Sequence, residues 1–157
     1  SLDPVWFDAL KIVLNELGFD GELAEKLKKT THVFKDEVYT VDGGMPSGIS
    51  GTSIFNTMIN NVIIKTLVIE TYRNIDLDKL KIIAYGDDVL ISYIDDLDPA
   101  ELAETGKNYG LTITPADKSD TFQKVTWDSV TFLKRGFKDD KKYPFLTHPI
   151  YPMKDVF

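Results

Sequence analysis

Residues 80–93 read LKIIAYGDDVLISY, in which two apolar runs flank a Gly-Asp-Asp turn. Apolar runs on both sides of a glycine-containing turn are typical of an antiparallel β-hairpin. Gly86 allows the backbone to turn where a side chain would clash. The sequence therefore predicts a hairpin that carries Asp87 and Asp88 at its tip.

The two adjacent carboxylates at this tip suit a hard divalent cation. Mg²⁺ prefers oxygen ligands and takes one or two carboxylates together with waters and substrate phosphates. Neighbouring strand residues point to opposite faces, so only one of Asp87 and Asp88 would face a metal squarely. A polar turn without a ligand is the alternative, because Gly-Asp is common in hairpins.

A glycine-rich loop and a long helix precede the hairpin. The loop, Gly43 to Gly51, reads GGMPSGISG, and its N–H groups and hydroxyls can cradle phosphate or ribose, although a mobile connector has the same composition. Apolar residues recur from Thr52 to Tyr72 around much of a helix, which predicts a buried helix. Asn56 lies one turn into it on the loop side, whereas Asn60 and Asn61 are expected to be ordinary surface amides.

The other predicted elements are short. We expect helices at 4–18, 22–29 and 98–109, and strands at 33–35, 38–41, 80–85, 89–93, 111–114, 131–137 and 144–147, with Asp36-Glu37 as the turn between the first two strands. Helices between local hairpins indicate an α+β domain with a largely antiparallel sheet covered by helices.

Composition excludes several classes of protein. A chain of 157 residues with 43% hydrophobic and 27% charged residues indicates one compact domain and not a disordered chain. The absence of cysteine excludes disulfides and thiolate sites. No apolar run reaches the roughly 18 residues of a membrane span. The net charge of −7 means that any contact with nucleic acid must be local or made through cations.

Basic residues after the hairpin could contact anions. Lys118 follows a predicted strand and could act as a general acid or bind phosphate, although a solvated loop lysine is the more common case. Lys134 and Arg135 belong to the only basic cluster of note, which could touch a nucleic-acid backbone or lie in a solvated hairpin.

Taken in order, these features resemble the palm domain of picornavirus RNA-dependent RNA polymerases, and the enterovirus and rhinovirus enzymes most closely. The resemblance runs almost end to end. The segments that resemble motifs B, C, D and E are residues 43–61, 82–88, 109–119 and 131–137.

This resemblance implies a polymerase palm with a three- or four-stranded antiparallel sheet. The Gly-Asp-Asp hairpin would be central, and two or three helices would cover one face. Residues 1–157 would form a single palm domain, in which 31–51 border the fingers and 131–157 approach the thumb. A missing N-terminal strand would leave an exposed sheet edge beside the hairpin, and such an edge favours self-association.

The resemblance also implies roles for individual residues. Asp87 would bind the catalytic Mg²⁺ ions, for which Mn²⁺ can substitute, and Asp88 would be a weaker or second-metal ligand. Lys118 would be the general acid that protonates pyrophosphate. The ribose 2′-hydroxyl would be read by Ser47, Thr52 and Asn56, and the primer end would be held by Lys134 and Arg135.

The parent protein would act on an RNA template-primer and ribonucleoside triphosphates, in the host-cell cytoplasm at viral replication complexes. Residues 1–7 resemble only the tail of motif A, whose aspartates would precede them, and Asp3 is better explained as a helix N-cap. Because phosphoryl transfer depends on positioning and charge stabilisation, we expect the 157-residue chain alone to be inactive.

Two other hypotheses remain. Ile49 stands where these enzymes commonly have cysteine, so an engineered or excised palm scaffold without enzymatic activity is one alternative. A nucleotidyl cyclase or reverse transcriptase built on a related palm is another, but the Gly-Asp-Asp context and the whole motif B run disfavour both.

Overall fold

The computed structural model describes residues 2–152 of the chain. Helices alternate with short hairpins along it. The elements are α1 (Val5–Glu16), α2 (Glu22–Leu27), β1 (Lys29–Phe34), β2 (Glu37–Asp42), α3 (Thr52–Tyr72), a 3₁₀ turn (Leu77–Lys79), β3 (Lys81–Tyr85), β4 (Asp88–Ser92), α4 (Pro99–Lys107), β5 (Gly136–Asp139) and β6 (Thr147–Ile150).

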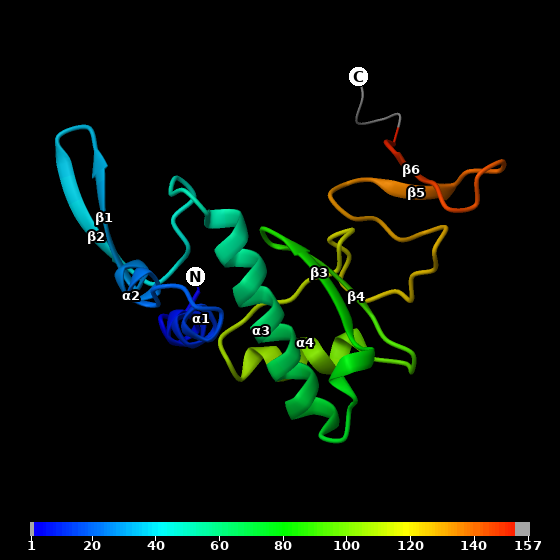
Figure 1. The fold of residues 1–157 in the computed structure, drawn as a ribbon, viewed down its shortest axis with the longest axis horizontal. Coiled ribbons are helices and arrows are strands. Elements are labelled where there is room, and N and C mark those ends of the chain that lie inside the picture. The colour runs from blue at the N-terminus through cyan, green and yellow to red at the C-terminus, as the bar shows by residue number, and fades with distance from the viewer. Residues whose placement is uncertain (1, 153–157) are drawn as a thin grey trace.

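The long helix α3 lies in the middle of the molecule (Figure 1). Helices α1 and α2 and the β1–β2 hairpin lie on one side of it, and the β3–β4 hairpin lies on the other (Figure 1). The β5–β6 hairpin stands at the far end, beyond β3–β4. This arrangement confirms a mixed α+β structure, and it places α3 directly beside the Gly-Asp-Asp hairpin.

The expected sheet of three or four strands is wrong for the described residues. Each of the three sheets there has two antiparallel strands, paired β1–β2, β3–β4 and β5–β6. Residues 111–114 form no strand; Leu111 and Ile113 pack against the core without a partner strand. Helix α3 packs against β3 of the Gly-Asp-Asp hairpin.

Several strand boundaries also differ from the prediction. The strand expected at 33–35 is β1, which begins at Lys29, and the strand expected at 144–147 is β6, which spans Thr147–Ile150. The β1–β2 turn is Lys35-Asp36 and not Asp36-Glu37, because Phe34 pairs with Glu37. The expected strand at 131–137 is interrupted by a turn, and β5 begins only at Gly136. The turn forms because residues 133 and 134 have positive φ, which no regular strand contains.

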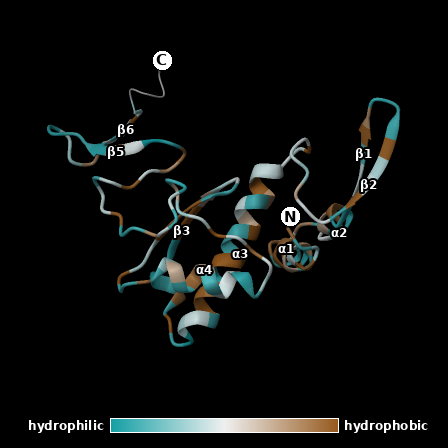
Figure 2. Ribbon diagram, turned by 180° about the vertical axis from the view of Figure 1, so that it is seen from behind, coloured by the Kyte–Doolittle hydropathy of each residue, from teal (hydrophilic) through white to brown (hydrophobic). Residues whose placement is uncertain are grey.

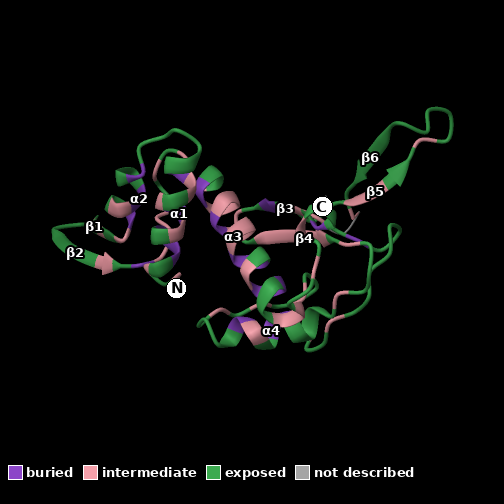
Figure 3. Ribbon diagram, turned by 60° about the horizontal axis from the view of Figure 1, so that its bottom comes forward, coloured by how far each residue is buried: buried purple, intermediate pink, exposed green. Residues whose placement is uncertain are grey.

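One hydrophobic core joins the helices. Figure 3 shows the buried segments on α1, α3 and α4, whereas the outer hairpins are largely exposed. The largest side chains with almost no exposure are Phe7, Leu10, Leu67 and Val68. The predicted helix from Thr52 to Tyr72 is confirmed at both ends. The helices expected at 4–18, 22–29 and 98–109 are confirmed with slightly shorter bounds.

On length and composition alone, α3 is also the one helix within residues 2–152 that could cross a membrane, with a mean hydropathy of 1.2. This differs from the prediction that no apolar run reaches the length of a membrane span. A helix in a protein core passes the same test. The apolar side chains of α3 (Figure 2) contribute to the hydrophobic core here. Its buried side chains are Phe55, Ile59, Ile63, Ile64, Leu67 and Val68.

Candidate active site at the Gly-Asp-Asp hairpin

The Gly-Asp-Asp hairpin has a tight turn of two residues. Tyr85 pairs with Asp88, so the turn consists of Gly86 and Asp87. Gly86 has φ of +59°, a left-handed conformation that glycine adopts without strain. Asp87 is exposed in the turn, whereas Asp88 is half-buried and begins β4. The predicted hairpin is therefore confirmed, and its two carboxylates occupy different environments.

Helix α3 holds this hairpin by two side-chain hydrogen bonds. The hydroxyl of Thr57 lies 3.0 Å from the carbonyl oxygen of Ala84 and 2.8 Å from that of Ser53, and its one proton is shared between these two acceptors. The amide of Asn60 donates to the carbonyl oxygen of Gly86 at 2.6 Å. Residues three apart on a helix lie on one face, so the two side chains grip the backbone on both sides of Tyr85.

The prediction that Asn60 is an ordinary surface amide is wrong, because its amide bonds to the hairpin. Asn61 fits that description better, because within residues 2–152 its amide bonds only to the Thr57 carbonyl one turn back. The available signal was the spacing of Thr57 and Asn60, two polar residues on one face of an otherwise apolar helix. The identity of their partner depends on how the helix packs, which the spacing does not give.

A second contact connects the hairpin to the segment that resembles motif E. The backbone N–H of Leu133 donates to Oδ2 of Asp88 at 2.7 Å. Leu133 is the first central residue of a turn closed by reciprocal backbone hydrogen bonds between Phe132 and Arg135, at 2.9 and 3.1 Å. The turn that carries Lys134 is thus tied directly to the second aspartate of the hairpin.

This turn is strained. Leu133 and Lys134 have φ of +52° and +60°, which type I′ turns require but which suits glycine or asparagine better. A left-handed residue with a β-carbon costs about 1–2 kcal/mol. A hydrogen bond to a charged acceptor is stronger than one to a neutral acceptor, so the contact with Asp88 offsets part of this strain.

Lys134 and Arg135 are both exposed, and they differ in their contacts. The guanidinium of Arg135 lies 4.6 Å from the ring centroid of Tyr151, and its Nη2 donates to the Tyr151 hydroxyl. Arginine stacks well on aromatic rings and keeps donors free for phosphate. The structure therefore brings the predicted primer-contact pair next to the hairpin, with Arg135 oriented by the C-terminal segment.

The glycine-rich loop is anchored at its start and at its end. The N–H of Gly43 donates to the carbonyl of Lys28 at 2.8 Å, and that of Gly44 donates to the carbonyl of Leu2 at 2.8 Å. The hydroxyl of Thr52 lies 2.8 Å from the carbonyl oxygen of Pro46 and 2.9 Å from that of Ile49. These hydrogen bonds hold both ends of the loop.

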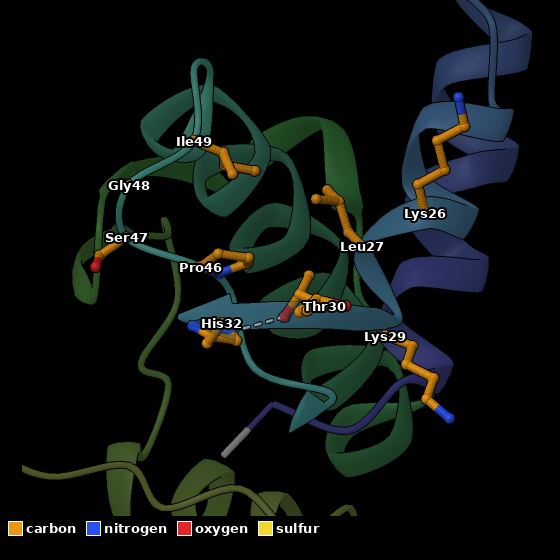
Figure 4. A pocket seen from close by; sticks show the side chains of 10 residues that line it. Lys26, Leu27, Lys29, Thr30, His32, Pro46, Ser47, Gly48 and Ile49 are labelled. Carbon is orange, nitrogen blue, oxygen red and sulfur yellow. Dashed lines mark hydrogen bonds between the residues drawn. The ribbon is translucent and has the colours of Figure 1, made fainter. Parts of the chain in front are cut away.

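The three residues expected to read ribose lie at this loop. Ser47 is exposed, and Asn56 is half-buried one turn into α3. Ser47 lines an open depression of about 640 Å³ between the loop and β1 (Figure 4). Within residues 2–152, the hydrogen bonds of the Thr52 hydroxyl stay inside the loop, and none of them reaches Ser47 or Asn56. The predicted network is therefore not assembled in this structure.

Lys118 lies in an exposed turn away from these contacts. It has φ of +59°, and its N–H donates to the carbonyl oxygen of Pro115 at 2.9 Å. The hydroxyl and the backbone N–H of Ser119 lower the pKa of neighbouring Asp117 below its usual value. Among the described residues, no hydrogen bond or ion pair joins Lys118 to Asp87 or Asp88.

The hairpin supplies only part of a metal site. Residues 2–152 contain no group of three or more histidine, aspartate or glutamate side chains that could hold a metal ion. Two adjacent carboxylates, one of them exposed, do suit Mg²⁺ when waters and substrate phosphates complete its coordination. The ligand set therefore fits an ion that is shared with a substrate and with other protein residues.

Comparison with known proteins decides the family. A family model described as "Viral RNA-dependent RNA polymerase" matches residues 5–148. The chain belongs to this family. It is 65% identical over 157 residues to the genome polyprotein of human rhinovirus C (strain C15) and 59% identical over 158 residues to that of poliovirus type 1 (strain Mahoney). The picornavirus polymerase recognised from motif order is thereby confirmed.

The fold agrees with this assignment. The structure matches the Sicinivirus 3Dpol RNA-dependent RNA polymerase with a TM-score of 0.86 and 30% sequence identity. That match covers 99% of this chain and 35% of the Sicinivirus chain. The chain spans only 7% of the length of the polyproteins. It is thus part of a viral RNA-dependent RNA polymerase.

Proposed function

We propose that residues 1–157 form the palm domain of an RNA-directed RNA polymerase, with Asp87 at the catalytic centre. The observation that carries the proposal is the exposed Asp87 on a two-residue turn whose backbone is held by Asn60 of α3. Catalysis of phosphoryl transfer depends on fixed positions of charge, and a turn held in this way provides one. Residues 31–51 would border the fingers, and residues 131–157 would approach the thumb.

Asp87 would be the main ligand of Mg²⁺, or of Mn²⁺ in its place. Oδ2 of Asp88 accepts the N–H of Leu133, so its other oxygen would serve as the weaker or second-metal contact. Bound metal would supply charge stabilisation for the triphosphate and the departing pyrophosphate. The protein's own contribution is to hold the turn backbone through Asn60 and one oxygen of Asp88 through the Leu133 N–H.

Substrate binding would use residues on both sides of the hairpin. Ser47, Thr52 and Asn56 would read the 2′-hydroxyl that distinguishes ribonucleotides from deoxyribonucleotides. The Thr52 hydroxyl bonds within the loop, so its contribution to this readout would be to shape the loop around Ser47.

The remaining roles fall to three basic residues. Lys118 would donate a proton to the pyrophosphate leaving group, and Lys134 and Arg135 would hold the primer backbone. The substrates of the parent protein would be an RNA template-primer and ribonucleoside triphosphates. Its site of action would be viral replication complexes in the host cytoplasm.

The test is primer extension by a longer polymerase chain that contains these residues. Asp87→Asn should lower template-dependent incorporation of ribonucleotides by several orders of magnitude, because it removes a charge at the reacting phosphates. Asp36→Asn, at the exposed β1–β2 turn, is the matched control and should retain activity. Equal activity of the two variants would exclude Asp87 from the catalytic centre.

A further inference from the structure

The second aspartate of the hairpin, Asp88, contacts a distant segment of the chain. Asp87 lies in the exposed turn, whereas Oδ2 of Asp88 accepts the N–H of Leu133 at 2.7 Å. The two residues of this contact are 45 positions apart in the chain. It is the contact through which the hairpin holds a turn from a distant segment.

The turn at Leu133 needs such a contact. Both of its central residues, Leu133 and Lys134, carry side chains at positive φ, of +52° and +60°. Its own closure consists of the two backbone hydrogen bonds between Phe132 and Arg135. Residues in such conformations persist where the surrounding structure holds them, and they concentrate at functional sites.

We propose that Asp88 is a positioning residue for this turn: its carboxylate holds the Leu133 N–H and thereby sets Lys134 and Arg135 relative to the tip that carries Asp87. The contact of Lys134 and Arg135 with primer rests on the proposed function, but the role of Asp88 in shaping the turn does not. A carboxylate binds an N–H more strongly than a neutral acceptor does, which explains an aspartate at this position.

Amide hydrogen exchange of the 157-residue chain, followed by NMR without RNA, nucleotide or metal, tests the role. Asp88→Ala should accelerate exchange at Leu133 by about tenfold or more, because a charge-assisted hydrogen bond is lost. Asp88→Asn retains a neutral acceptor and should give an intermediate rate. Asp87→Asn is the matched control and should leave the Leu133 rate unchanged. The exchange of Leu67 and Val68 in the core reports separately whether each variant is folded.

A double variant separates positioning from general damage. Glycine tolerates positive φ, so Leu133→Gly removes strain from the turn. If loss of the Asp88 contact acts through this strain, Leu133→Gly should compensate for Asp88→Ala. The Phe132 and Arg135 amide shifts of the double variant should then move back toward those of the Leu133→Gly single variant. Equal Leu133 exchange in Asp88→Ala and Asp87→Asn would overturn the proposal, as would a double variant with no restoration. Since no substrate is present, these results do not depend on whether the polymerase assay with Asp87→Asn succeeds.

Discussion

The side-chain amide of Asn60 donates a hydrogen bond to the carbonyl oxygen of Gly86 at 2.6 Å. This contact joins the middle of α3 to the turn that carries Asp87. One turn earlier on the same face, Thr57 donates to Ala84. The helix that follows the glycine-rich loop thus positions the candidate catalytic aspartate, so the loop and the carboxylates share one rigid support.

Asn60→Ala should loosen the turn without dismantling the core. The loss of one hydrogen bond lowers the free energy of unfolding by about 0.5–1.5 kcal/mol. The amides of Gly86 and Asp87 should exchange faster. Asn61→Ala is the matched control, because among the described residues the Asn61 amide bonds only to Thr57 within α3. Urea denaturation and amide exchange measure both effects, and identical exchange at Asp87 in the two variants would contradict the positioning role of Asn60.

The hairpin and the helix that supports it were predictable from the local sequence pattern. The contacts between them were not. The hairpin and α3 follow from apolar periodicity and from a glycine at the turn. The partner of Asn60 depends on which helix face meets β3, which is a tertiary property. Leu133 and Lys134 run against local preference, because neither favours positive φ, so a strand was predicted there. Such conflicts between local preference and final structure are expected where function holds the chain.

The prediction of a sheet with three or four strands was wrong for a related reason. Alternating apolar residues such as Leu111 and Ile113 indicate an extended segment with one buried face, but they do not specify a hydrogen-bonding partner. Here the buried face packs on the helices, where Ile113 would lie 3.3 Å from a β-carbon added to Gly106. Strand pairing between distant segments requires information that a local pattern lacks.

Gly43→Ala should destabilise the chain, whereas Gly48→Ala should not. Gly43 has φ of +72°, and a β-carbon there would lie 2.5 Å from the carbonyl oxygen of Leu2. The left-handed conformation alone costs about 1–2 kcal/mol with a β-carbon, and the backbone clash adds to it. A β-carbon at Gly48 meets no atom within 4 Å. Urea denaturation compares the two variants, and equal stabilities would show that the loop start is not constrained as described.

Acid should loosen the β5–β6 hairpin. The hydrogen bond from His148, followed by those from the N–H groups of Tyr143 and Lys142, lowers the pKa of Asp140 below its usual 3.8. Because the pKa is lowered on folding, the carboxylate stabilises the hairpin above pH 3.8, and this contribution is lost as the pH falls below that value.

The hairpin amides, followed by NMR from about pH 5 to about pH 2, should report this loss. Asp140→Asn should lack the acid transition and should already show a looser hairpin at neutral pH. Asp128→Asn, at an exposed loop position, should behave as the unmodified chain does. Persistence of the acid transition in Asp140→Asn would rule out this carboxylate as its source.

The chain should self-associate through its open hairpin edges, as unpaired strands favour pairing between molecules. The β1–β2 hairpin is the strongest candidate, since Val33, Phe34 and Val38 are 71%, 62% and 67% exposed. Sedimentation should give a mass that rises with concentration. Val33→Lys should suppress the rise, while Ile12→Lys, at a 64% exposed position of α1, should not. A mass of one chain at all concentrations would refute the prediction.

A polypeptide limited to residues 1–157 should bind Mn²⁺ at the hairpin and yet fail to extend a primer. Asp87 and Asp88 can hold an ion weakly through one or two carboxylates, and paramagnetic broadening should centre on Tyr85–Val89 and disappear in Asp87→Asn. Catalysis requires more than metal binding, because the transferred phosphoryl group also needs further stabilising charges and a fixed substrate geometry. Primer extension above the Asp87→Asn background would defeat the prediction of inactivity. Broadening that is uniform, or absent, would show that the two carboxylates need additional ligands even to bind metal.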